Sequence, residues 1–135
     1  MRFMAWHVEY FKARPAAQGR SGIYEEGKDL DVGESLLVFI SFEKADENRS
    51  DEVLKKGTEE IANVAGNIGV GTVILNPYAH LFAELSNPGF AQSMLALFQQ
   101  KLSERFEVYR LAFGLFYEIE LKAKGHKLSR ISRIV

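Results

Sequence analysis

The sequence predicts an α/β fold in which helices cover a mixed β-sheet, forming a sandwich within a single domain. Short apolar segments rich in β-branched residues alternate with two longer segments whose apolar residues recur at helical spacing. The resulting order, β-β-β-α-β-α-β-β-β, is typical of a sheet covered by helices. The length of 135 residues suits one domain over residues 1–135. A chain of this size can bury about 68% of its surface on folding.

The first half of the chain contains three predicted strands and one predicted helix. Large apolar residues mix with polar ones over residues 2–12, which predicts a first strand. The stretch from Pro15 to Gly33 is rich in turn residues, and Ile23-Tyr24 could form a short strand within it. The continuous apolar run Leu36–Phe42 predicts a buried strand. Residues 50–68 predict a helix, with Ser50 as its N-terminal cap.

The second half alternates strands and helices in the same way. Val70–Leu75 predicts a short buried strand, and Asn87-Pro88 opens a second helix because proline is tolerated in the first turn. The apolar stripe expected to face the core comprises Phe90, Met94, Leu97, Phe98 and Leu102. Three further strands are expected over Glu107–Leu111, Leu115–Ala123 and Leu128–Ile134.

Composition excludes several classes of chemistry. The absence of cysteine excludes disulfides, thiolate catalysis and Cys-ligated metals. The three histidines, His7, His80 and His126, lack metal-binding spacing, so we expect no metal and no cofactor. Apolar runs are far shorter than the ~20 residues of a membrane span, and the N-terminus lacks the apolar region of a secretory signal. We therefore expect a cytoplasmic protein without a membrane partner.

The charge is unevenly distributed, although the net charge is only −1. Residues 122–135 carry five basic groups and no acid: Lys122, Lys124, Lys127, Arg130 and Arg133. The remaining 121 residues carry 12 basic and 18 acidic groups, a net charge of −6. A basic end on an acidic body is typical either of a polyanion-binding surface or of a solvated strand.

Motifs for side-chain catalysis are scarce. The glycines over residues 66–71 close a helix rather than open one, so they indicate a helix cap and not a phosphate-binding loop. The most unusual segment is Asn76–Leu81, where a strand ends in Asn-Pro and a short helical turn over Ala79–Leu85 begins. Ligands bind at the carboxyl ends of strands in α/β sheets. His80 could serve such a site, or could simply bond to a neighbour at the start of the turn.

Four blocks of sequence resemble a known family in their order and spacing. They are Phe39–Glu47; Asn76–Leu81 with Glu84, Leu85 and Pro88; Ala112–Gly114; and Lys124–His126 with Leu128, Ser132 and Arg133. The chain resembles the N-terminal editing domain of archaeal threonyl-tRNA synthetases, although residues 13–34 match poorly. The resemblance implies the fold of D-aminoacyl-tRNA deacylases, removal of serine from mischarged threonine tRNA, and further synthetase domains as partners. It also implies a homodimer, for which Phe3, Trp6 and Tyr10 would suit an interface or, equally, ordinary core packing.

The resemblance implies a site built largely from backbone groups. An aminoacyl ester is already activated, so its hydrolysis mainly requires a positioned water and a stabilised oxyanion. The 2′-hydroxyl of the terminal adenosine of the tRNA is implied to assist the water. The implied substrate-binding residues are Phe42, Glu43, Pro77, Tyr78, Ala79, Phe113, Gly114, Phe116 and Arg130. The candidate catalytic residues are His80, in a positioning role, and Tyr117, and the candidate tRNA-binding residues are Lys122, Lys124, Lys127 and Arg133.

Three positions depart from the family pattern. Tyr117 stands where the family has a lysine, Phe116 where it has a tyrosine, and Arg130 where it has an acid. Arg130 could therefore pair with a phosphate or with Glu43. A lysine general base is absent, so either side chains are dispensable here or the activity is weakened. Two alternatives stay open: a non-catalytic tRNA-binding or dimerisation module, and a D-aminoacyl-tRNA deacylase. The second is disfavoured because that family's Gly-Pro and Ser-Gln segments are missing.

Overall fold

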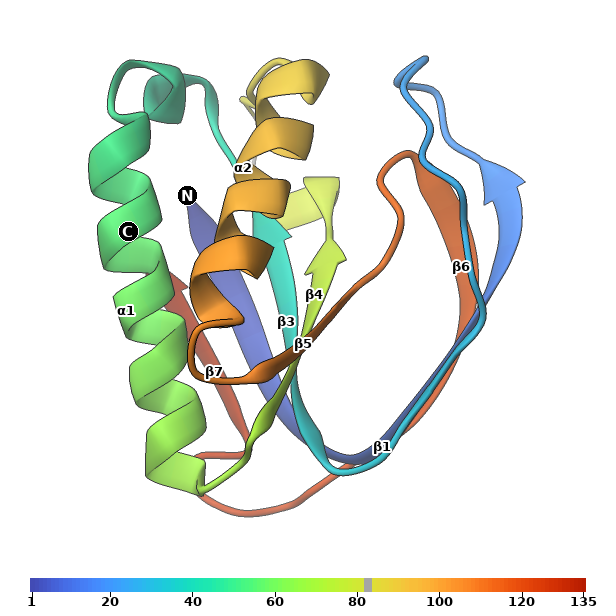
Figure 1. Cartoon of the computed structure of the whole chain (residues 1–135), viewed down its shortest axis with the longest axis vertical. Helices are drawn as coiled ribbons and strands as arrows, with labels where there is room; N and C mark the ends of the chain where they lie inside the picture. Colours follow the sequence, from blue (N-terminus) through green and yellow to red (C-terminus); the bar gives the residue numbers. More distant parts are fainter. Residues whose placement is uncertain (82–83) are drawn as a thin grey trace.

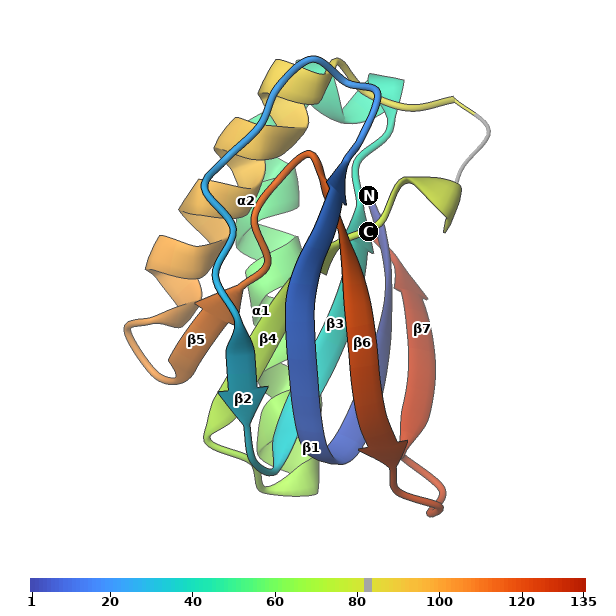
Figure 2. The same ribbon diagram turned by 90° about the vertical axis from the view of Figure 1, so that its right-hand side faces the viewer.

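Two helices pack side by side against one face of a curled seven-stranded sheet in the computed structural model, which describes residues 1–81 and 84–135. The strands β2-β1-β3-β4-β5 form a continuous path, and β6 and β7 both pair with β1. Figures 1 and 2 show that the second half of β1 curls away from the helices together with β6. The mixed α/β class with covering helices is confirmed.

The elements follow the predicted order. The strands are β1 Arg2–Gln18, β2 Leu30–Val32, β3 Ser35–Ser41, β4 Thr72–Pro77, β5 Glu107–Arg110, β6 Leu115–Ala123 and β7 Arg130–Ile134. The helices are α1 Ser50–Ile68 and α2 Pro88–Leu102, with two short 3-10 helices, η1 Lys44–Asn48 and η2 Ala79–Leu81. The short helical turn expected over Ala79–Leu85 is thus confirmed as far as Leu81, and its residues 82–83 lie outside the described residues. No helix within the described residues is long and apolar enough to cross a membrane.

β1 organises the sheet, and it is longer than predicted. It pairs with β3 and β7 along its first half and with β2 and β6 along its second half. The pairing with β6 shifts register between Val8 and Tyr10 and again between Pro15 and Ala17. Such bulges increase the twist and bend of a strand and tolerate proline. The strand therefore runs to Gln18, although the turn-like residues after position 12 predicted that it would end there.

β3 is buried on both faces of the sheet, and its side chains alternate between two cores. Leu36, Val38 and Ile40 face the helices, where Phe98 of α2 also lies. Leu37 and Phe39 belong to a second core, inside the curl formed by the second half of β1 and by β6. Period-two alternation with both faces covered explains why the sequence of β3 is apolar without interruption.

Three local predictions are wrong. Leu97 is 42% exposed, whereas Leu95 is 1% exposed and completes the buried stripe of α2. Ile23-Tyr24 forms no strand, and the short strand lies instead at Leu30–Val32, where β1 offers a free edge. Ser50 is the first residue of α1, and the cap position is Arg49, because η1 already leads the chain into the helix. By contrast, the Asn87 side chain accepts a hydrogen bond from the N–H of Gly89 and caps α2 as predicted.

Two of the three aromatic residues considered for a dimer interface, Phe3 and Trp6, pack in the interior. Phe3 is fully buried in the core beneath the helices. Trp6 packs edge-on against Phe39, with ring centroids 5.2 Å apart, in the second core. These residues therefore lend no support to a dimer interface.

Shortening Ile61 to valine is expected to lower the free energy of unfolding by about 0.5–1.5 kcal/mol, the usual cost of removing one buried methylene. Ile61 is fully buried in α1. Ile134→Val is the matched control, because Ile134 is 72% exposed and the same change should leave stability nearly unaltered. Chemical denaturation measures both variants, and equal losses would contradict the assigned core.

Candidate functional site

Three of the segments implied by the resemblance meet at one edge of the sheet. β3, β4 and β5 are parallel, so their carboxyl ends lie at the same edge of the sheet and point toward the upper half of Figure 1. Phe42-Glu43 follows β3, Pro77–His80 ends and follows β4, and Phe113-Gly114 follows β5. The Tyr78 N–H donates to the Ile40 carbonyl at 2.9 Å and ties the end of β4 to β3. We call this the carboxyl edge.

The backbone of Phe42 and Glu43 is already bound within the protein. The Phe42 carbonyl accepts a hydrogen bond from the N–H of Ser86 at 3.1 Å. The Glu43 N–H donates to the buried carboxylate of Asp46 at 2.8 Å. These two hydrogen bonds therefore fix the end of β3. The Phe42 carbonyl and the Glu43 N–H are already paired before any substrate binds.

An aromatic row leads across the sheet to His80. Phe39 contacts Tyr78 edge-on at 5.6 Å between ring centroids, and Tyr78 contacts His80 in the same way at 5.4 Å. The His80 side chain is exposed and makes no hydrogen bond to another described residue. The ring geometry supports a surface on which a flat group could rest. Among the described residues, His80 has no partner that would make it half of an acid–base pair.

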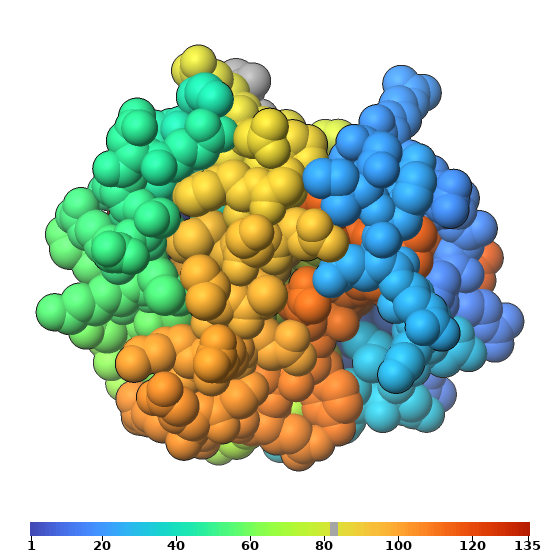
Figure 3. Space-filling view, turned by 45° about the horizontal axis from the view of Figure 1, so that its top comes forward, coloured from blue at the N-terminus to red at the C-terminus, as the bar shows by residue number. Residues whose placement is uncertain are grey.

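Gly114 forms a turn that only glycine can form here. Its φ is +83°, and a Cβ at this position would lie 1.8 Å from the carbonyl oxygen of Ile23. The Gly114 carbonyl accepts a hydrogen bond from the N–H of Gly19 at 2.6 Å. Figure 3 shows the chain around residues 20–28, in blue, lying over this orange connection and beside α2. The segment that matched the family poorly therefore packs directly on the candidate site.

Tyr117 and Phe116 point to opposite sides of β6. The Tyr117 hydroxyl accepts a hydrogen bond from the Ala112 N–H at 2.9 Å, and its ring packs against the second core. Phe116 is 59% exposed. Because side chains alternate along a strand, the structure does not bring these two candidate residues together. The hydroxyl of Tyr117 stabilises the turn before Gly114 by accepting the hydrogen bond from Ala112.

Arg130 does not reach Glu43, so that predicted pairing is wrong. Arg130 lies opposite Trp6 in the pairing of β7 with β1, and Ile134 lies opposite Arg2. Arg2 in turn pairs with Ser41 at the carboxyl end of β3. Arg130 therefore stands four residues, or about 13 Å of strand, away from the carboxyl edge. It shares a sheet face with Trp6.

Lys122, Lys124 and Lys127, which lie near or beyond the end of β6, are far from the Phe113-Gly114 turn. β6 begins at that turn and runs about 26 Å away from it, at the usual rise of a strand. Three of the five C-terminal basic residues form ion pairs: Lys122 with Glu9, Lys124 with Glu34 and Arg133 with Glu60. Hydrogen bonds from His7 and Lys124 lower the pKa of Glu34 below its usual value. Within the described chain, Lys127 and Arg130 form no ion pair with an acidic side chain.

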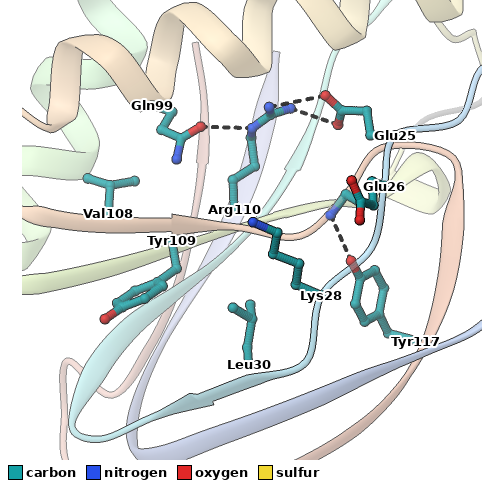
Figure 4. A pocket seen from close by; sticks show the side chains of 10 residues that line it. Glu25, Glu26, Lys28, Leu30, Gln99, Val108, Tyr109, Arg110 and Tyr117 are labelled. Atoms are coloured by element: carbon teal, nitrogen blue, oxygen red, sulfur yellow. Dashed lines mark hydrogen bonds and ion pairs between the residues drawn. The ribbon is translucent and has the colours of Figure 1, made fainter.

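A pocket of about 250 Å³ opens beside the turn, between residues 25–30, β5 and Tyr117. Figure 4 shows Arg110 between Glu25 and Gln99 of α2 in the wall of this pocket. Sequence reasoning missed Glu25 and Arg110, because 85 residues separate them and no motif surrounds either one. Among the described residues, no group of three or more histidine or acidic side chains could hold a metal ion.

Comparison with known proteins identifies the family. The model of the archaea-specific editing domain of threonyl-tRNA synthetase matches residues 1–135. The chain is 36% identical to a threonine–tRNA ligase of Methanosphaera stadtmanae and 37% identical to one of Thermococcus kodakarensis, in each case over 100% of this chain and 22% of the relative. It therefore spans about a fifth of the length of these relatives. The chain belongs to the archaea-specific editing domain family of threonyl-tRNA synthetases.

Membership in this family gives the chain a proofreading role and, in general terms, a deacylase role. Three of the four segments that carried the resemblance gather at the carboxyl edge, so it is the candidate site for that role.

Proposed function

We propose that the chain hydrolyses the ester that joins L-serine to the terminal adenosine of mischarged threonine tRNA, at the carboxyl edge. One observation carries this proposal: three separate segments bring backbone to one edge of the sheet, and neither His80 nor Tyr117 there belongs to an acid–base pair. An arrangement of this kind suits a substrate that is already activated and supplies a functional group of its own.

The proposed reaction uses the RNA as its proton carrier. The oxygen of a bound water attacks the ester carbonyl carbon while the 2′-hydroxyl accepts a hydrogen bond from that water and relays its proton. The bond from the carbonyl carbon to the 3′-oxygen then breaks, and the 3′-oxygen leaves with a proton. Backbone N–H groups at the carboxyl edge stabilise the oxyanion formed between these steps. The released products are serine and tRNA with a free 3′-hydroxyl.

His80 and Tyr117 have supporting roles in this proposal. The His80 ring, held edge-on by Tyr78, would help to position the terminal adenosine. Tyr117 would hold the turn through the Ala112 N–H. The substrate-binding residues remain those at the carboxyl edge, with the Phe42 and Glu43 backbone supporting the strand end. Arg130, about 13 Å of strand from that edge, and Phe116, on the other side of β6 from Tyr117, would contact more distant parts of the tRNA.

His80→Ala and Tyr117→Phe are each expected to retain seryl-tRNA hydrolysis within about tenfold of the original rate. Neither change removes a general acid or base, although Tyr117→Phe leaves the Ala112 N–H without its acceptor, which costs about 1–3 kcal/mol of stability. Single-turnover assays measure the rates, with circular dichroism to verify folding. A loss of about three orders of magnitude in a folded variant would be of the size of lost general acid–base catalysis and would contradict this mechanism.

Selectivity requires that the site admit serine and misplace threonine, which is larger by one methyl group. Favourable contact with a single methyl separates two substrates by only about 1–3 kcal/mol. We propose that the rigid backbone of the carboxyl edge excludes the threonine side chain or displaces the water when threonine is bound. Backbone suits this task because it cannot change rotamer to make room.

We also propose that the C-terminal basic residues contact tRNA phosphates, with Lys127 as the best test. Lys127 is exposed and unpaired with any acidic group in the described chain, whereas Lys122, Lys124 and Arg133 already have such partners. Lys127→Ala is expected to weaken tRNA binding and to reduce the slope of log K against log salt by about 0.7–0.9, the value for one phosphate contact. Lys55→Ala, at an exposed lysine of α1, is the control. If both variants have equal slopes, the C-terminal basic residues form only a solvent-exposed face and do not contact tRNA phosphates.

From the resemblance we further propose a cytoplasmic homodimer with the fold of D-aminoacyl-tRNA deacylases. Sedimentation at micromolar concentration checks the dimer, because a monomer mass would contradict it. The catalytic proposal itself is tested by incubating the purified chain with seryl-tRNA and measuring serine release. No release above the spontaneous rate would favour the alternative of a non-catalytic tRNA-binding module.

A further inference from the structure

We infer that Glu25 is a positioning residue of this site: its carboxylate, oriented by Arg110, fixes the Phe113-Gly114 turn. The inference rests on the proposed function, since the turn matters for catalysis only if the carboxyl edge is the site. Glu25 is not among the residues that carried the resemblance, so its role is argued from its contacts alone.

Glu25 binds Phe113 through both its backbone and its side chain. We call these contacts, together with the ion pair between Glu25 and Arg110, the clamp. The Phe113 N–H donates to Oε1 of Glu25 at 2.6 Å. In return, the Glu25 N–H donates to the Phe113 carbonyl at 3.0 Å. Both polar backbone groups of Phe113 are therefore held by one residue, which fixes the position and orientation of the peptide groups on either side of it.

Arg110 determines where the carboxylate lies. Its Nη1 and Nη2 donate to Oε1 and Oε2 of Glu25 at 2.9 and 3.1 Å, and its Nε donates to Oε1 of Gln99 at 3.0 Å. The side chain of Arg110 is only 17% exposed and that of Glu25 only 24% exposed. A bidentate arginine–carboxylate pair has a defined geometry as well as a favourable energy. The clamp thus joins the turn to the end of β5 and to α2 (Figure 4).

The clamp leaves one backbone donor free at the turn. Of three consecutive N–H groups, that of Ala112 donates to Tyr117 and that of Phe113 donates to Glu25. The N–H of Gly114 forms no hydrogen bond with any part of the chain that the structure describes. Glu25 and Tyr117 therefore orient the turn so that the Gly114 N–H is available to an oxyanion.

The matched variants are Glu25→Gln and Glu26→Gln. Glutamine offers one acceptor oxygen, and its NH₂ group would face the donors of Arg110. Glu26 is the adjacent, exposed glutamate, and its replacement removes the same charge without touching the clamp. For seryl-tRNA hydrolysis, Glu25→Gln is expected to lower kcat by about ten- to a hundredfold, as a small misplacement of a catalytic group does. KM should stay within about twofold, and Glu26→Gln should match the unmodified chain in both constants.

A second variant, Arg110→Lys, and a second measurement, amide hydrogen exchange, test the same role independently. Arg110→Lys keeps the charge but lacks the bidentate fork, so it should reproduce the loss in kcat. Amide hydrogen exchange should be faster at Phe113 in Glu25→Gln and unchanged in Glu26→Gln, whatever the activity. Unchanged exchange, or unchanged kcat in both clamp variants of an active domain, would overturn the role of Glu25. An unmodified chain that releases no serine would instead overturn the proposed function, and the exchange data would still report whether the clamp exists.

Discussion

Seryl-tRNA whose terminal adenosine lacks the 2′-hydroxyl is expected to be hydrolysed about a thousandfold more slowly than the ordinary substrate. This factor lies within the range for lost general acid–base catalysis. The expectation follows from the carboxyl edge, where His80 makes ring contact with Tyr78 and the Tyr117 hydroxyl is bound to the Ala112 N–H. If no side chain there carries protons, the group that does so must come from the substrate.

The measurement compares single-turnover rates for the two substrates at saturating enzyme. A 2′-deoxy substitution at the preceding nucleotide is the control, because it makes a similar change to the RNA one residue away from the ester. Equal rates for the ordinary and the terminally deoxygenated substrate would contradict RNA-assisted hydrolysis and would direct attention back to the protein side chains.

Gly114→Ala is expected to be the most damaging single substitution at the carboxyl edge. The positive φ of Gly114 would cost an alanine about 1–2 kcal/mol. The new methyl carbon would also lie 1.8 Å from the Ile23 carbonyl oxygen, so the turn must move away from residues 19–25. Because a displacement near 1 Å can reduce a rate by about a hundredfold, serine release should fall at least that far.

Gly22→Ala separates the two causes of that loss. Gly22 also has a positive φ, +77°, but a Cβ there would meet nothing within 4 Å. Gly22→Ala should therefore lose stability through its backbone conformation while keeping its rate of hydrolysis. Thermal denaturation and the single-turnover assay measure both variants, and an equal loss of rate in the two would contradict the special position of the Gly114 turn.

The parts of the fold that could be predicted are those with strong local periodicity. The helix over residues 50–68 and the buried strand β3 follow directly from the spacing of their apolar residues. The second half of β1 could not be predicted, because it contains Pro15 and small or polar residues that become a strand only when β6 pairs with them. β2 has three residues, too few for a periodic signal.

The candidate site was predictable in its backbone segments and not in its side-chain contacts. The resemblance led to Pro77–His80 and Phe113-Gly114, and the parallel order of β3, β4 and β5 places these segments at one edge. Pairing with Glu43, one of the two possibilities for Arg130, was wrong because the sequence does not specify which end of β7 lies toward the carboxyl end of β3. Glu25 was missed because its partner Arg110 is near only in the folded chain.

The proposed function requires that this domain remove serine, and not threonine, from threonine tRNA. The most direct test is deacylation of L-seryl-, L-threonyl- and D-aminoacyl-tRNA by the purified chain, measured in parallel under single-turnover conditions. We predict rapid release of L-serine, with L-threonine and the D-amino acid staying near their spontaneous rates. Release of all three at the spontaneous rate, or of the D-amino acid faster than L-serine, would contradict it.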